Sequence, residues 1–163
     1  MSGVEIERKW LVPETPPFAL GPLPPDRIQQ GYLTIGGDGG ETRVRRRGGR
    51  CTLTVKSGSG LVRRETEIGI TAAQFDGLWA ATEGARVEKQ RYTLRDEQGH
   101  VIELDVYAGA LSGLVVAEVE FDDPRGAESF AAPYWFGHEV TDDPRYKNQR
   151  LATAGEPPAP MSR

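Results

Sequence analysis

Short runs in which apolar and polar side chains alternate recur along most of the chain. Alternation with a period of two is typical of a β-strand whose two faces meet different surroundings. Eight runs are predicted as strands, at residues 4–10, 28–35, 42–47, 51–56, 63–70, 87–95, 101–107 and 114–121. Because eight antiparallel strands are enough to close a small barrel, we expect an eight-stranded closed β-barrel or tunnel.

Other segments carry the signals of turns and helices. Turn-forming breaks separate several of the strands, at residues 36–40, 58–60 and 97–99. Thr71 and Gln74 form a capping-box pair at the start of a helical pattern. Asp123-Pro124 and Asp143-Pro144 each place an N-cap residue before a proline, which favours the start of a short helix. The pattern therefore predicts a mostly β (α+β) fold with a few peripheral helices.

Length and composition agree with a single β-rich unit. The chain has 163 residues, the length of one domain, and its 20 glycines and 12 prolines favour many turns. No stretch reads as a domain-scale linker. We expect one domain over residues 1–154 and a flexible, proline-rich tail over residues 155–163.

The cellular setting is inferred from cysteine content and apolar runs. One cysteine, Cys51, allows no intrachain disulfide, and its place in an alternating run suggests a small packing residue. The N-terminal segment lacks the apolar run of a signal peptide, and no stretch approaches the roughly 20 apolar residues of a membrane helix. We therefore expect a cytoplasmic protein without a membrane partner.

Splitting each run into its two faces places side chains of one charge sign together on several strands. Arg43, Arg45 and Arg47 share one face of their strand, and Glu118 and Glu120 share one face of theirs. An ordinary antiparallel sheet also has a face in solvent, but such faces usually mix both signs. Like charges two residues apart repel, and folding does not require them. We interpret the charged faces as the lining of the barrel.

Together these faces would supply eight acids and seven bases to the lumen. The acids are Glu5, Glu7, Glu65, Glu67, Glu103, Asp105, Glu118 and Glu120, and the bases are Lys9, Arg43, Arg45, Arg47, Lys56, Lys89 and Arg91. Clustered carboxylates favour a hard divalent cation, and clustered guanidinium and ammonium groups favour a polyanion. A metal-bound chain of phosphates satisfies both requirements.

The order of these residues resembles a known family. Glu5-Ile6-Glu7-Arg8-Lys9 resembles the Glu-x-Glu-x-Lys signature of the CYTH superfamily, the triphosphate tunnel metalloenzymes. Further matches follow in the family's order, namely Arg43-x-Arg45, Lys56, Glu65-x-Glu67, Lys89-x-Arg91, Asp105, Glu118-x-Glu120 and the segment from Gly137 to Asn148. The resemblance covers residues 4 to about 152 and implies a tunnel that binds triphosphates, usually with Mg²⁺ or Mn²⁺.

The resemblance also implies roles for individual residues. Metal ligands would be Glu5, Glu7, Asp105, Glu118 and Glu120. The phosphates would be held by Lys9, Arg43, Arg45, Lys56, Lys89, Arg91 and Lys147. Candidates for the group that activates the attacking water are Lys9, Lys56 and Glu5. We interpret Glu65 and Glu67 as supports that orient basic neighbours across the lumen.

The expected reaction is metal-dependent hydrolysis of inorganic triphosphate to pyrophosphate and orthophosphate, as in small bacterial members of the family. A class IV-like adenylate cyclase or a thiamine triphosphatase would use the same fold. A different class of protein, a non-catalytic polyphosphate- or nucleotide-binding module, would keep the same charges.

RNA binding by the arginine-rich stretch is a weaker alternative. Eight of the 20 basic residues fall between Arg43 and Arg64, yet the chain carries a net charge of −4. This balance suggests a local anion site rather than a nucleic-acid surface. The partner is therefore expected to be a small triphosphate-containing molecule, bound by a monomer or homodimer.

Overall fold

The computed structural model describes residues 6–13, 16, 20, 22–38, 40–57 and 64–159. Eight antiparallel strands form one sheet in the order β1-β8-β7-β6-β2-β3-β4-β5. Their bounds are β1 (Ile6–Leu11), β2 (Asp26–Ile35), β3 (Glu41–Arg47), β4 (Arg50–Ser57), β5 (Arg64–Ile70), β6 (Arg86–Arg95), β7 (Val101–Tyr107) and β8 (Val115–Phe121). Each predicted strand is present, although the predicted start at residue 4 and the turn at residues 58–60 lie outside the described residues.

The described residues also form three short α-helices and three 3₁₀ turns, of which α1, η1 and η2 lie between strands and the others follow β8. They are α1 (Ala72–Trp79), η1 (Ala80–Thr82), η2 (Gly109–Leu111), α2 (Pro124–Ser129), η3 (Pro144–Tyr146) and α3 (Asn148–Ala154). The capping box at α1 is confirmed, because Gln74 N donates to Thr71 Oγ1 and Thr71 N donates to Gln74 Oε1. Asp123 and Asp143 cap α2 and η3 as predicted. No helix in the described part of the chain is long and apolar enough to cross a membrane.

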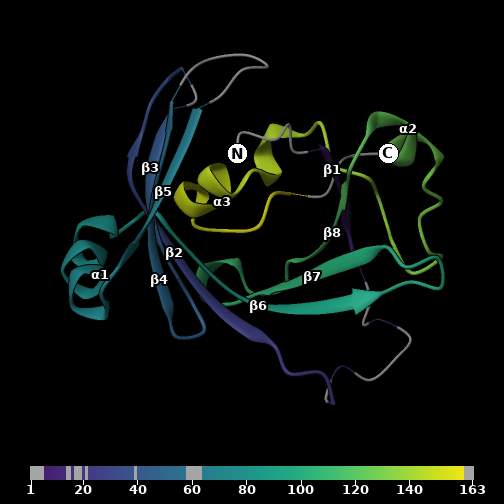
Figure 1. The fold of residues 1–163 in the computed structure, drawn as a ribbon, viewed down its shortest axis with the longest axis horizontal. Helices are drawn as coiled ribbons and strands as arrows, with labels where there is room; N and C mark the ends of the chain where they lie inside the picture. Colours follow the sequence, from purple (N-terminus) through teal and green to yellow (C-terminus); the bar gives the residue numbers. More distant parts are fainter. Residues whose placement is uncertain are drawn as a thin grey trace.

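The sheet bends into two arms with a concave face between them (Figure 1). One arm holds β2 to β5 with α1 on its outside, and the other holds β6, β7, β8 and β1. Paired residues in neighbouring strands share a face, so the register identifies which side chains line the concavity. Lys9 pairs with Glu118 and Glu118 with Glu103, while Arg43 pairs with Thr54 and Thr54 with Glu67. The predicted charged faces therefore form one continuous surface.

Apolar side chains cover the two outer faces of the sheet and one end of the concave face. On one outer face Trp10, Leu104 and Val119 pack with Phe130, and on the other Phe75 of α1 packs with Val44 and Cys51. A third cluster places α3 between the two arms, as Figure 1 shows. Its buried members include residues of the helix and of the strands, namely Leu151, Ala152, Tyr32, Val87, Tyr107 and Val116. The helix thus closes one end of the concave face and leaves the charged part beyond it.

The predicted closure of the sheet into a barrel is not seen in the described residues. β1 and β5 are the two ends of the strand order, and no ladder joins them. The reason lies in the outer edge of β1, where Leu11 N donates to His138 O and Val140 N donates to Lys9 O. Because residues 137–141 occupy these backbone groups, that part of β1 is unavailable to β5. The coarser prediction of one eight-stranded antiparallel sheet is confirmed.

Candidate active site

Arg43 presents an unpartnered donor on the concave face of the β2–β5 arm. Its Nη1 lies 3.2 Å from Oε1 of Glu41, a buried acid and the first residue of β3. Its Nε is buried and has no hydrogen-bond partner among the described residues. A buried N–H without an acceptor is costly, so such a group suits the oxygen of a bound anion.

Other bases of this arm are held by neighbouring polar side chains. Arg45 Nε donates to Gln30 Oε1 at 2.7 Å, and Lys56 Nζ lies 3.7 Å from Glu65 Oε2. Thr54 Oγ1 donates to Glu67 Oε2 at 3.0 Å. Arg47 is ion-paired with Asp26 at 2.8 Å and lines a hollow of about 170 Å³ together with Arg45, Arg50, Thr52 and Glu67. Glu65 thus contacts Lys56 of the neighbouring strand, and Glu67 contacts Thr54.

Asp105 lies at the centre of the other arm and is completely buried. Its Oδ2 accepts from Lys89 Nζ at 2.6 Å and from Arg91 Nη2 at 2.8 Å, and its Oδ1 accepts from Arg91 Nε at 2.7 Å. Arg91 also contacts Glu103 and lies 3.5 Å from Glu118. In this structure both oxygens of Asp105 therefore hold cationic side chains in place.

Glu118 is the most buried of the other acids predicted to bind metal. Its Oε1 accepts no hydrogen bond among the described residues, although Lys9 Nζ lies 3.3 Å away. Glu7 of β1 is paired with Glu120 of β8, and this pair lies two residues along the strands from the pair of Lys9 and Glu118. Both are solvent-exposed, and Glu5 lies outside the described residues. The register therefore brings Glu7, Glu118 and Glu120 together on neighbouring strands.

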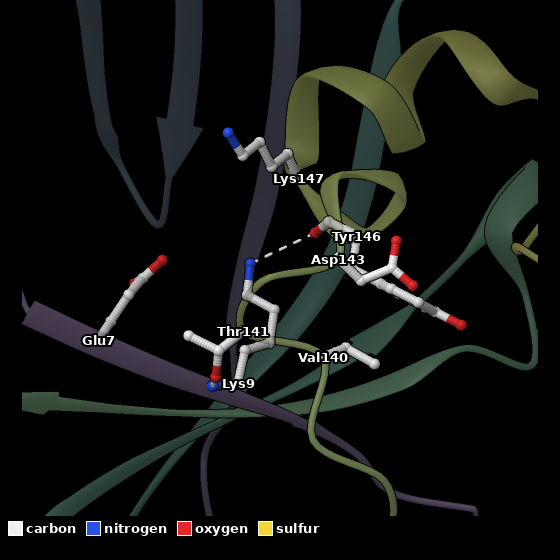
Figure 2. A pocket seen from close by; sticks show the side chains of 7 residues that line it. All are labelled: Glu7, Lys9, Val140, Thr141, Asp143, Tyr146 and Lys147. Atoms are coloured by element: carbon white, nitrogen blue, oxygen red, sulfur yellow. Dashed lines mark hydrogen bonds between the residues drawn. The ribbon is translucent and has the colours of Figure 1, made fainter. Parts of the chain in front are cut away.

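The segment before α3 forms a small pocket against β1 (Figure 2). Lys9 Nζ donates to the carbonyl oxygen of Tyr146 at 3.3 Å, which ties β1 to this segment. Lys147 and Glu7 line the same pocket, together with Val140, Thr141, Asp143 and Tyr146. Lys147 is exposed and is the residue immediately before α3. The structure thus places the predicted late lysine beside Lys9, at the rim of the concave face.

Burial and neighbouring charges shift several pKa values on this surface. Burial alone would raise the pKa of Asp105, but Lys89 and Arg91 outweigh it and hold that pKa at about 2. Burial lowers the pKa of Lys89, against the opposing effect of Asp105. Burial also lowers the pKa of Arg45, and the charges of Arg43 and Arg91 add to the effect. The concave face therefore holds cations under mutual repulsion, which an anion would relieve.

The carboxylates fit a divalent cation that is shared with a ligand. Within the described residues, no three acid, histidine or cysteine side chains approach closely enough to enclose a cation. Oε1 of Glu118 accepts no hydrogen bond from the described residues and is a buried anionic oxygen, the donor type that Mg²⁺ and Mn²⁺ prefer. Mg²⁺ commonly takes one or two carboxylates and completes its coordination with phosphate oxygens and water. This donor set suits a metal that arrives with phosphate.

Sequence reasoning missed three buried polar residues of the site. Gln30, Tyr32 and Glu41 all lie on the concave face, paired with or next to the arginines of β3. Gln30 and Tyr32 are uncharged, so a search for charged faces passes over them. Their two-residue spacing on a predicted strand is the signal that could have placed them beside Ile28.

Comparisons with known proteins reveal close relatives over nearly the whole chain. No family model matches the sequence. An inorganic triphosphatase of Nitrosomonas europaea is 50% identical over 148 residues, which cover 91% of this chain and 96% of the relative. An inorganic triphosphatase of Acetivibrio thermocellus is 37% identical over 153 residues, covering 91% and 93%.

Solved structures agree with the sequence relatives. A crystal structure of an inorganic triphosphatase matches with a TM-score of 0.74 at 47% identity, over 91% of this chain and 94% of that one. A Hippeastrum protein, described as a putative adenylyl cyclase with a dominant triphosphatase activity, matches with a TM-score of 0.55. Its identity is 16% over 76% of this chain and 82% of that one, so it supports the fold alone. The shared length, the identity and the arrangement of charged strands place this chain in the inorganic triphosphatase family, on the fold of the triphosphate tunnel enzymes.

Proposed function

We propose that this protein hydrolyses inorganic triphosphate to pyrophosphate and orthophosphate on the concave face of its sheet. The observation that carries the proposal is a pair of buried groups of opposite charge on that face whose hydrogen-bonding capacity is not filled. Among the described residues, Arg43 Nε has no hydrogen-bond acceptor on one arm, and on the other Glu118 Oε1 accepts no hydrogen bond and has the Lys9 ammonium 3.3 Å away. A phosphate chain with a bound cation would supply both partners. The activity in the names of the two curated relatives agrees with this proposal.

The arginines and the lysines of the concave face would bind the phosphates in different ways. Arg43 and Arg45 on one arm can bind non-bridging oxygens through two nitrogens at once. Arg91 on the other arm would add its positive charge, because its nitrogens already contact Asp105, Glu103 and Glu118. Lys9, Lys56, Lys89 and Lys147 add point charges around them. Three acids hold cationic side chains in place before the substrate binds, namely Asp105 for Arg91, Glu41 for Arg43 and Glu65 for Lys56. These side chains therefore need to move less during the reaction.

Glu7, Glu118 and Glu120, with Glu5 from the segment ahead of β1, would hold Mg²⁺ or Mn²⁺. The bound cation would neutralise charge that develops on the phosphate oxygens. Asp105 would not bind the metal directly, because its oxygens already bind Lys89 and Arg91. We therefore assign it to the positioning of these two cations.

The reaction itself needs an in-line water and a group that takes its proton. Water oxygen forms a bond to the terminal phosphorus as the bridging P–O bond breaks, and pyrophosphate leaves with the bond's electron pair. Lys9, Lys56 and Glu5 are the candidates from the sequence for accepting the proton.

Closure of the two arms into a tunnel is part of the same proposal. The β2–β5 arm carries the arginine-rich strand, and the opposite arm carries most of the acids. A metal-bound triphosphate would bridge the two arms and favour their approach. The edge of β1 near Leu11 would remain with residues 137–141.

The deciding experiment is phosphate release by the purified protein. Inorganic triphosphate, ATP and thiamine triphosphate are compared with Mg²⁺, Mn²⁺ or EDTA. We expect release from inorganic triphosphate that depends on the metal and greatly exceeds release from ATP. Cyclic AMP formation from ATP would instead identify a cyclase. Metal-dependent binding of triphosphate without turnover would identify a polyphosphate-binding module, and either result would overturn the proposal.

A further inference from the structure

Gln30 is a fully buried amide that joins two donors of the concave face. It lies on β2, paired with Arg45 of β3 on one side and with Val87 of β6 on the other. Its Oε1 accepts from Arg45 Nε at 2.7 Å, and its Nε2 donates to Tyr32 Oη at 2.7 Å. The mechanism outlined above gives this residue no role.

The chemistry of its partners fixes the orientation of the amide. Arg45 Nε can only donate, so the oxygen of Gln30 must face it and the NH₂ group must face Tyr32. Tyr32 Oη therefore accepts from Gln30. With this donor on its oxygen, the tyrosine can still donate its own hydrogen.

The same bond determines how Arg45 meets a ligand. A guanidinium has five N–H bonds, and Gln30 takes the one on Nε. The two terminal nitrogens remain as a planar fork, the geometry that matches two oxygens of a phosphate. A free side chain of this length would sample several directions, and the buried amide removes that freedom.

We propose that Gln30 is a positioning residue that aims the Arg45 fork and the Tyr32 hydroxyl at the phosphate chain, an inference that rests on the proposed function. It acts through its two neighbours and does not touch the substrate. An amide is required because one atom must accept and the other must donate. Neither a carboxylate nor an apolar side chain of similar size meets both requirements.

Two substitutions separate the two bonds. Gln30→Met keeps the volume and removes both bonds, so we expect kcat to fall by about 10- to 100-fold, the range usual for residues that orient a site's ligands. Gln30→Glu keeps an acceptor for Arg45 but places a negative charge beside the fork and loses the donor to Tyr32. We expect its main effect to be a higher KM for triphosphate, because the added charge opposes the anion.

The control is Gln29→Met, on the same strand and the opposite face. Gln29 donates to Glu88 at 3.2 Å and is paired with Arg46 and Glu88, on the face opposite Arg45. Its kinetic constants should stay within about twofold of the wild type, since it lies outside the machinery. Thermal melting of all variants shows which of them are folded at the assay temperature.

A double-mutant cycle tests the bond to Tyr32 directly. If Gln30 acts through this hydroxyl, Gln30→Met and Tyr32→Phe combined should lose less activity than the product of the single losses. Full additivity, or unchanged kcat and KM in folded Gln30→Met, would overturn the inference and leave Gln30 as a packing residue.

Calorimetry with triphosphate and Mg²⁺ keeps this test separate from the proposed function. A wild type that binds without turnover would refute the hydrolase, and the Kd of Gln30→Met would then test the inference, with about tenfold weaker binding expected. A wild type that neither binds nor hydrolyses triphosphate would overturn both.

Discussion

Asp105 shows how a single buried carboxylate can organise a polar site. It is the shared partner of Lys89 and Arg91, and none of the three side chains is more than 10% exposed. Arg91 also contacts Glu103 and lies 3.5 Å from Glu118, so the two cations are balanced by acids in this buried place. Buried charges of this kind are tolerated because each has a partner of opposite sign.

Asp105→Asn should be strongly destabilising at neutral pH. The substitution leaves two buried cations without their counter-charge, and breaking a buried pair in this way costs about 3–5 kcal/mol. The free energy of unfolding from urea titration measures the cost. Glu128→Gln, on the exposed surface of α2, is the control and should change stability by less than about 0.5 kcal/mol.

The stability of Asp105→Asn relative to the wild type should also depend on pH. The pKa of Asp105 is lowered to about 2 in the folded protein, so its stabilising effect is complete above its ordinary value of 3.8. The effect is lost as the pH falls from about 4 towards about 2. The stability difference between wild type and Asp105→Asn should therefore be constant from pH 5 to 7 and shrink below about pH 4. A difference that stayed constant below pH 4 would argue against the ionised pair.

For single residues, the sequence predicts which face of a strand a side chain occupies better than it predicts which side chains it contacts. Alternation with a period of two correctly placed Arg43, Lys89 and Glu118 on the concave face, because a strand offers only two faces. It does not reveal that Asp105 binds two cations, because alternation alone does not give the register between β6 and β7 that sets Arg91 opposite Asp105. Gln30 was missed because it carries no charge.

Among the elements, α3 has the largest effect on the shape of the site. It packs inside the concave face with Leu151 in the apolar cluster, and Tyr107 Oη donates to Asn148 Oδ1 at 2.9 Å. Lys147 stands directly ahead of it. The helix thus couples the apolar end of the concave face to the rim of the charged part.

Leu151→Ala should loosen this coupling. Leu151 is 1% exposed, and truncation of a buried leucine costs about 2–5 kcal/mol. We also expect weaker triphosphate binding, because Lys147 loses its fixed support. Urea denaturation and calorimetry with triphosphate measure the two effects. Thr153→Ala, on the exposed side of the same helix, should change neither.

The strands were predictable because their signal is local, whereas closure depends on distant segments. Alternation and turn residues lie within each run, and the helix caps at Thr71, Asp123 and Asp143 are equally local. Whether β1 can pair with β5 depends on which segment occupies the edge of β1, and residues 137–141 occupy part of it. Residues 137–141 carry no strand pattern from which this contact could be predicted.

For the whole molecule, the separation of charge between the arms predicts linked binding of metal and anion. Mg²⁺ and triphosphate together should raise the melting temperature more than either alone, because each relieves repulsion on a different arm. Ligand at 100 times its Kd stabilises a fold by about 2.7 kcal/mol. In Glu118→Gln, the additional rise in melting temperature that Mg²⁺ produces should be largely lost. An undiminished shift would show that Glu118 is not a metal ligand.

The uncovered edge of β5 also affects how separate molecules behave towards one another. Within the described residues β5 pairs with β4 alone, so its other side presents a row of unused peptide groups. Such a row is a template for strand addition and aggregation unless charges discourage approach. Arg64, Glu65 and Glu67 supply these charges along a strand that is exposed for almost its whole length. Glu65, which contacts Lys56 of the site, thus also discourages association between molecules in a crowded solution.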